Sequence, residues 1–360
     1  VDPETQQQPV STSHLFDLAS ITKLFTSTAF LALVSAGRAT LQTPLVDVIP
    51  EFGEISPRPL DGGQDPHSKQ TLPTPQDAQG KTATPADVTF WHLLTHTSSL
   101  PPWRDAFNAA GPAPTPPTQP DPLDNSTRWQ NALHALVRYN FVGTPAENIV
   151  RYSDVGLMLL GEAVARLHGD TLQNAIDALV SQPAGLQDVY FNPVRDERVP
   201  LEQTLPTEDD PTWRKRRVWG EVHDENACGV GGVAGHAGLF ASARSVAQLG
   251  QSWQHRPDVL GIDPELAASA KREDAVTDWH RRGLGFVLKG LTGNSSASEA
   301  FGANTYGHTG FTGTSLWIDP DINLIVACIT NSVYPGRGNP GTHEFRRALH
   351  AAIAEGLKRA

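Results

Sequence analysis

Cysteine is nearly absent from this chain, and no apolar run approaches the length of a membrane span. The two cysteines, Cys228 and Cys328, lie far apart, which excludes a disulfide framework and a cysteine-based zinc site. The apolar run from Ala29 to Ala36 is too short to cross a bilayer, so we expect no membrane span. The net charge of −11 argues against nucleic acid or an anionic membrane as the main partner.

The remaining composition is typical of a globular protein. The chain has 360 residues, of which 39% are hydrophobic, and this is enough for a large core and two lobes. We expect residues 15–240 to form a mainly helical domain. Residues 241–360, together with 1–14, are expected to form a sheet domain.

Hydrophobic periodicity predicts most of the secondary structure. Helices are predicted at residues 20–36, 126–139, 155–167, 171–180, 243–253 and 342–357. Strands are predicted at residues 284–288, 304–310, 314–318 and 324–330. Two stretches rich in proline and other turn-forming residues, 53–87 and 111–124, are expected to be surface insertions.

Lysine is also scarce, with seven residues against 21 arginines, and Ser20 is the only serine followed by lysine three positions later. On a helix, Ser20 and Lys23 would lie one turn apart on the same face. A serine hydroxyl needs a neighbouring base to become a nucleophile. Lys23 could be that base if burial lowers its pKa, and Ile21, Leu24 and Phe25 would supply the burial. The alternative is helix capping or chance.

Two downstream stretches could complete such a site. Tyr152 lies in a Tyr-Ser-Asp loop just before a helix, and its hydroxyl could shuttle a proton if an ammonium group is near. The alternative is an aromatic ring that packs under that helix. The segment 306–314 combines three glycines with small polar residues, which favours close approach of a ligand to a strand. The alternative is a bulge or a hairpin turn.

No motif predicts a cofactor. The glycine-dense segment Gly231–Gly238 matches neither the phosphate loop nor the dinucleotide fingerprint, so we interpret it as tight packing near the cleft. His92 and His96 are four residues apart, a spacing that suits a metal on a helix. Since no third ligand is nearby, we expect structural histidines instead, and neither a metal nor a nucleotide.

Three motifs in one order carry a resemblance: Ser20-x-x-Lys23, Tyr152-x-Asp154 and His308-Thr309-Gly310. Together they resemble the serine penicillin-recognising family of class C β-lactamases, DD-peptidases, D-aminopeptidases and related esterases. Supporting stretches run over residues 93–101, 235–240 and 313–317. The resemblance extends from about residue 15 to the end of the chain.

The resemblance implies an α+β fold of the β-lactamase/transpeptidase type, with a mostly antiparallel sheet flanked by helices and an all-helical domain. It further implies that Ser20 is the acylated nucleophile, that Lys23 helps to remove its proton, and that Tyr152 is the partner acid/base. His308, Thr309 and Gly310 would line the cleft. The backbone N–H groups of Ser20 and Phe311 would form the oxyanion hole.

Two residues depart from the family pattern. Asp154 stands where the family usually has an asparagine that contacts the substrate. We therefore expect Asp154→Asn to shift specificity more than turnover of a neutral ester. His308 stands where lactamases mostly carry lysine, so any attraction for a carboxylate should fade above about pH 6.5. Both departures favour an esterase or a D-amino-acid peptidase over a β-lactamase.

The resemblance also implies two N-terminal strands that no segment before Ser20 provides. The apolar run Leu324–Thr330 reads as a central strand, and its sheet would then lack a neighbour. We expect an upstream hairpin, cut away or bound as a separate fragment, to supply it.

The predicted function is a serine hydrolase that acts through an acyl-enzyme on an ester or a small peptide-like amide. The alternatives are a β-lactamase or a non-catalytic sensor that binds penicillin or peptidoglycan fragments on the same scaffold. The expected partner is a small-molecule substrate. The resemblance favours an extracytoplasmic location, periplasmic or secreted.

Overall fold

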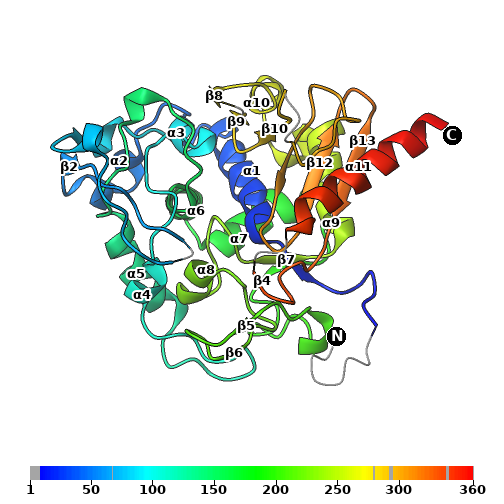
Figure 1. Cartoon of the computed structure of the whole chain (residues 1–360), viewed down its shortest axis with the longest axis horizontal. Helices are drawn as coiled ribbons and strands as arrows, with labels where there is room; N and C mark the ends of the chain where they lie inside the picture. The colour runs from blue at the N-terminus through cyan, green and yellow to red at the C-terminus, as the bar shows by residue number, and fades with distance from the viewer. Residues whose placement is uncertain (1–8, 67, 279, 292–294, 338–339, 360) are drawn as a thin grey trace.

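The computed structural model describes residues 9–66, 68–278, 280–291, 295–337 and 340–359. Helix α1 (Thr22–Ser35) runs through the middle of the molecule, with helices on one side and a sheet on the other (Figure 1). It is buried from Thr22 to Leu33 because apolar and small residues surround it. The predicted helix is thus confirmed, and a 3-10 turn, η1 (Ala19–Ile21), leads into it.

The helical side is built from short elements around α1 and α6, which contact each other. A glycine pair permits close packing here: a Cβ at Gly235 would lie 2.2 Å from the carbonyl oxygen of Leu157 on α6. The glycine-dense segment therefore serves packing, as predicted. The helices of this side are α2 (Leu45–Val48), α3 (Phe90–Thr95), α4 (Ala106–Ala110), α5 (Asn125–Leu136), α6 (Asp154–His168), α7 (Leu172–Ile176) and α8 (Glu225–Gly229).

The main sheet of the described residues has six antiparallel strands in the order β13-β12-β11-β10-β9-β8. Its register places His308 opposite Leu316 and Thr309 opposite Ser315. The strands are β8 (Ala275–Thr277), β9 (His280–Arg282), β10 (Val287–Leu288), β11 (Tyr306–Thr309), β12 (Ser315–Asp319) and β13 (Leu324–Cys328).

Both faces of this sheet are covered, which explains its unbroken apolar runs. Leu316 and Ile318 belong to the main core, and α9 (Ala243–His255) packs against β12 and β13. Trp317 and Val326 point the other way and form a second cluster with Ala354 of α11 (Gly341–Arg359). The helix α10 (Pro264–Ala270) precedes the sheet.

Smaller sheets complete the fold. The strand before the nucleophile, β1, pairs with β7, and β7 pairs with β4. The two-stranded sheets are β2-β3 and β5-β6. Their bounds are β1 (Phe16–Asp17), β2 (Arg58–Pro59), β3 (Thr82–Ala83), β4 (Val189–Phe191), β5 (Asp209–Asp210), β6 (Arg216–Arg217) and β7 (Leu239–Ala241).

Two sequence predictions need correction. The strand at 284–288 is only β10, and the hairpin β8-β9 before it was not predicted. The helix at 171–180 ends at Ile176 and continues as a π-helical turn, Asp177–Ser181. The run that contains β13 has a neighbour on one side only in the sheet that the described residues form, and the strands expected to pair with its other side stay a prediction. The α+β class is confirmed, and the division at residue 240 stays a prediction.

Candidate active site

Ser20 lies in η1, immediately before α1, and is half-buried. The preceding residue, Ala19, has a left-handed φ of 47°, which a non-glycine residue adopts only when its surroundings enforce it. The Asp17 carboxylate accepts hydrogen bonds from the backbone N–H groups of Ala19 and His223, at 2.8 and 2.6 Å. These contacts fix the turn that presents the Ser20 hydroxyl.

The Lys23 ammonium group lies beside Ser20, as the motif spacing predicts. Its Nζ is 2.8 Å from Ser20 Oγ, 3.0 Å from the carbonyl oxygen of His236 and 2.8 Å from the Asp154 carboxylate. An ammonium group has three N–H donors, and three acceptors surround this one. Lys23 is therefore a fully satisfied cation, although its side chain is only 1% exposed.

The expected lowering of the Lys23 pKa is wrong. Burial alone would lower this pKa, but the Asp154 carboxylate, followed by Tyr152, raises it above the ordinary value. The expectation failed because it considered the apolar neighbours and left out Asp154. Asp154 was expected to contact the substrate, and its contact in the structure is with Lys23. The part of Lys23 in removing the Ser20 proton stays a prediction.

Tyr152 forms the second hydrogen bond to the nucleophile. Its hydroxyl donates to Ser20 Oγ at 2.9 Å. Burial raises the pKa of Tyr152, while the Lys23 ammonium opposes that shift, so the phenol is protonated at neutral pH. The ring packs against His96, with the ring centroids 4.6 Å apart. The ring therefore packs against His96 while the hydroxyl faces Ser20, and the acid/base role of Tyr152 stays a prediction.

The two histidines of the possible metal pair have structural contacts. His96 Nδ1 accepts a hydrogen bond from the backbone N–H of Ser153 at 3.1 Å. His92 Nδ1 lies 3.1 Å from the backbone nitrogen of Thr89, at the start of α3. Within the described part of the chain, no group of three or more His, Cys, Asp and Glu side chains is placed to hold a metal ion.

His308 does not supply the positive charge that its position suggested. Burial, with the cations Lys23 and Arg282, holds the pKa of His308 well below its ordinary value. Its Nδ1 lies 2.7 Å from the carbonyl oxygen of Thr309, and because a carbonyl only accepts, the proton is on Nδ1. His308 is thus a neutral ring whose Nε2 is an acceptor. The expected titration near pH 6.5 is wrong for this buried group.

The turn after β11 brings Phe311 to the nucleophile. The hydroxyl of Thr312 donates to the carbonyl oxygen of Asp17 at 2.8 Å, and that of Thr314 donates to Leu18 at 2.9 Å. Gly310 is required for this contact, since a Cβ there would lie 2.5 Å from the Leu18 carbonyl oxygen. Gly310 and Gly313 therefore lie in a hairpin turn that is tied to the residues before Ser20, and Gly307 lies within β11.

Two cavities meet at Ser20. One, of about 300 Å³, is lined by Ser20, Tyr152, Trp103 and Phe311 among others. The other, of about 550 Å³, is bordered by Ser20, Tyr152 and the β11 strand with His308, Thr309 and Gly310. Every predicted site residue except Lys23, which lies beneath Ser20, therefore lines at least one of the two cavities.

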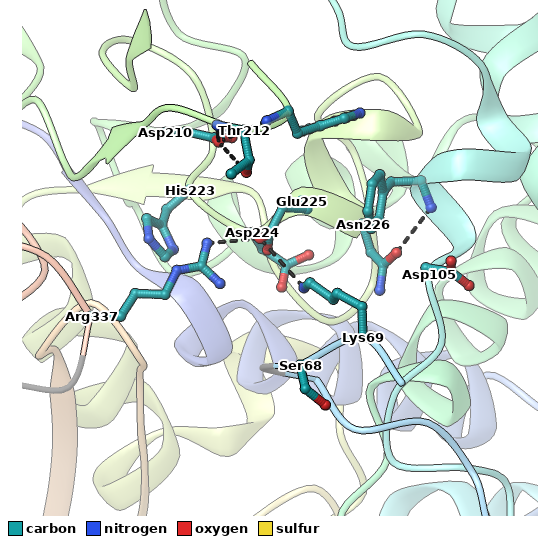
Figure 2. Close-up of polar contacts among 12 residues, drawn as sticks. Ser68, Lys69, Asp105, Asp210, Thr212, His223, Asp224, Glu225, Asn226 and Arg337 are labelled. Carbon is teal, nitrogen blue, oxygen red and sulfur yellow. Dashed lines mark hydrogen bonds and ion pairs between the residues drawn. The ribbon is translucent and has the colours of Figure 1, made fainter. Parts of the chain in front are cut away.

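The rim of the smaller cavity is held by ion pairs. Figure 2 shows Lys69 and Arg337 approaching Glu225 from opposite sides. Lys69 Nζ and Arg337 Nη2 lie 3.5 and 2.8 Å from Glu225 Oε1, and Arg337 also pairs with Glu208. Lys69 comes from the first predicted insertion and lies 4.1 Å from the Trp103 ring centroid. The insertion thus forms part of the cleft rim.

Two residues that support the site, Asp17 and Arg282, were not predicted from the sequence. Arg282 ends β9, and its guanidinium lies 5.4 Å from the centroid of the Tyr152 ring. No short motif announces these residues, because each acts through contacts between segments far apart in the chain.

The sequence is similar to those of known proteins over nearly its whole length. A family model described as Beta-lactamase matches residues 2–351. The chain is 29% identical to a putative D-alanyl-D-alanine carboxypeptidase of Escherichia coli, over 93% of this chain and 73% of that protein. It is also 29% identical to the esterase EstB of Burkholderia gladioli, over 96% and 84%.

Solved structures agree on the fold. The simvastatin synthase LovD of Aspergillus terreus aligns with a TM-score of 0.68 at 18% identity, covering 100% of this chain and 88% of that one. At that identity the likeness concerns the fold. No helix in the described ranges is long and apolar enough to cross a bilayer. The match over nearly the whole chain places it in the beta-lactamase family, and it is a serine hydrolase of that family.

Proposed function

We propose that Ser20 is the acylated nucleophile of this hydrolase and that Tyr152 is its general base. The observation that carries the proposal is the position of Ser20 Oγ, which lies 2.8 Å from Lys23 Nζ and 2.9 Å from the Tyr152 hydroxyl where two cavities meet. A nucleophile, a proton acceptor and a fixed cation are the parts that acyl transfer requires.

Acylation begins when Tyr152 has lost its proton. The Lys23 ammonium, held by Asp154, lies 4.9 Å from the Tyr152 ring centroid and favours the phenolate. The phenolate takes the Ser20 proton as Oγ attacks the substrate carbonyl carbon. The resulting oxyanion accepts hydrogen bonds from the backbone N–H groups of Ser20 and Phe311, and losing one such donor typically costs about 3 kcal/mol.

Collapse of the tetrahedral intermediate breaks the bond to the leaving group. Tyr152, now protonated, gives its proton to the leaving oxygen or nitrogen and becomes a phenolate again. The same phenolate then takes a proton from a water molecule, which attacks the Ser20 ester. As the second intermediate collapses, the bond between Ser20 Oγ and the acyl carbon breaks, Tyr152 returns its proton to Oγ, and the acid leaves.

The substrates that we propose are short esters and small peptide-like amides. The smaller cavity is lined by Trp103, Phe311, Pro102 and Ala237, which suit a small apolar acyl group. The other cavity is lined by Thr309, Gly310 and Arg346 among others, whose polar groups suit a more polar part of the substrate. The relatives named as a carboxypeptidase and as an esterase support both substrate classes equally.

Steady-state hydrolysis of p-nitrophenyl acetate tests this proposal. We expect turnover that is abolished in Ser20→Ala and reduced at least 100-fold in Tyr152→Phe, in line with the usual worth of a general base. Ser126→Ala, which changes an exposed serine on α5, is the matched control and should be fully active. Turnover that survives Ser20→Ala would contradict the proposal, and a single burst without turnover would favour the non-catalytic sensor.

An extracytoplasmic location is part of the same proposal and is supported by the relative named as a D-alanyl-D-alanine carboxypeptidase. A strand-forming segment that pairs with β13 is also proposed, because β13 has a neighbour on one side only among the described strands. Cell fractionation tests the first point. Slow amide hydrogen exchange along both edges of β13 would support the second.

A further inference from the structure

Three side chains from distant parts of the sequence meet in an ion-pair bridge at the smaller cavity. Lys69 belongs to the first insertion, Glu225 begins α8, and Arg337 follows β13. Glu225 Oε1 lies 3.5 Å from Lys69 Nζ and 2.8 Å from Arg337 Nη2, so one carboxylate joins the two cations (Figure 2). These three residues are the rim bridge, and all of them line the cavity that Ser20 also lines.

The rim bridge is held at both ends. Lys69 Nζ lies 4.1 Å from the centroid of the Trp103 ring, which is a cation–π contact. Arg337 Nε lies 2.8 Å from the carboxylate of Glu208, and His223 lies 3.1 Å from the same carboxylate. Burial alone would raise the pKa of Glu208, but His223 and Arg337 lower it to about 2, so this carboxylate is charged at neutral pH. Arg337 therefore has a second anion that fixes its position.

The smaller cavity has an apolar inner part and a charged outer end. Its inner part contains Ala19, which directly precedes Ser20, and Trp103, and both residues are buried. Its outer end contains the rim bridge, in which the side chains of Lys69 and Arg337 are 34% and 31% exposed. A group bound at Ser20 therefore meets apolar side chains first and ionised side chains near the solvent.

We propose that the rim bridge limits the length of the acyl group that the protein accepts. The inference rests on the proposed function, in which the smaller cavity takes the acyl group. A short acyl chain on Ser20 stays within the apolar inner part, where its burial is favourable. A longer chain reaches the rim bridge and must either strip water from its charges or separate its ion pairs, and both cost free energy. The preferred substrates are thus esters and small amides of short-chain acids.

A pair of p-nitrophenyl esters that differ only in acyl length, the butyrate and the decanoate, tests the proposal below the micelle concentration of the decanoate. A straight decanoyl chain is longer than a compact cavity of about 300 Å³ is across. The quantity to compare is the ratio of kcat/KM for the decanoate to kcat/KM for the butyrate. We expect a ratio well below one in the wild type. Glu225→Gln should raise this ratio by about 3- to 10-fold, the effect of losing one or two partly exposed ion pairs.

Lys69→Met supplies a second variant, which changes a partly exposed side chain at the other end of the same ion pair. It should also raise the ratio. If both variants open one bridge, Glu225→Gln combined with Lys69→Met should raise the ratio no further than the larger single effect. Additive effects would contradict a single bridge.

Glu54→Gln is the matched control. Glu54 comes from the same insertion and pairs with Arg138 at 2.6 Å, and it is not among the described residues that line the two cavities at Ser20. Its substitution removes an ion pair of the insertion but leaves the rim bridge in place, so the ratio should stay at the wild-type value.

A change in stability alone would overturn the proposal. If folded Glu225→Gln and Lys69→Met have a lower Tm and the wild-type ratio, the rim bridge only fastens the insertion to the rest of the protein. A wild-type protein that hydrolyses the decanoate as efficiently as the butyrate would also contradict it. A failure of the proposed function would instead appear as butyrate turnover that Ser20→Ala retains.

Discussion

Lys23 Nζ and the Asp154 carboxylate lie 2.8 Å apart beneath the nucleophile, where the first turns of α1 and α6 meet. The ion pair raises the pKa of Lys23 and so favours its charged form in the resting site. The sequence suggested that Asp154 contacts the substrate, whereas in the structure its carboxylate holds the Lys23 ammonium group.

Asp154→Asn should therefore impair catalysis on every substrate. An amide does not hold the ammonium as a carboxylate does, so the field that favours the Tyr152 phenolate weakens. We expect kcat for p-nitrophenyl acetate to fall by about 10- to 100-fold, within the range of a general-base contribution. Asp170→Asn, an exposed change just after the same helix, serves as control. A change in substrate preference with kcat intact would return Asp154 to the role of a substrate contact.

The kcat/KM for a neutral ester should keep increasing with pH and should not pass through a maximum near neutrality. Because burial raises the Tyr152 pKa, the phenolate is a minor species at neutral pH and grows as pH increases. We expect kcat/KM to increase by about tenfold per pH unit between pH 6 and 9, after spontaneous hydrolysis is subtracted. Because the His308 pKa is lowered, the plot of kcat/KM against pH should show no change of slope near pH 6.5. A decline above pH 6.5 would identify a protonated histidine as essential.

Acid should destabilise the fold through two buried histidines. His96 and His308 have folded-state pKa values well below the ordinary value, so below pH 6.5 the unfolded chain binds more protons than the folded one. Stability is complete above pH 6.5 and is lost as pH falls, by up to about 1.4 kcal/mol per unit for each histidine.

The measurement is the difference in Tm between pH 7.5 and pH 5. His308→Gln should reduce this difference, because glutamine has no proton to gain, whereas His255→Gln at an exposed position should leave it as it is. Equal pH sensitivity in wild type and His308→Gln would show that His308 does not contribute.

Much of the fold and of the catalytic group could be predicted from local pattern. Ser20 and Lys23 lie within one helical turn of each other. The strands that contain His308 and Trp317 have alternating or continuous apolar side chains over several residues. Such features depend on residues near in sequence. The family resemblance joined the three motifs, and the distances among Ser20, Lys23 and Tyr152 agree with that grouping.

The remaining features depend on contacts between distant segments. The Lys23 pKa could not be predicted from its apolar neighbours, because its direction is set by Asp154, which lies far along the chain. Arg282 was missed since β9 is only three residues long, with no apolar alternation to mark it. The neutrality of His308 follows from burial together with two cations, and neither is visible in the motif.

The central claim, that Ser20 becomes acylated, is tested most directly by intact-mass spectrometry of the protein quenched during turnover of a slow ester, followed by peptide mapping. We predict a mass increase equal to the acyl group, located on Ser20, and a longer-lived adduct in Tyr152→Phe if any forms. Ser20→Ala should show no adduct. An acyl group on another residue, or hydrolysis at full rate by Ser20→Ala, would contradict the account.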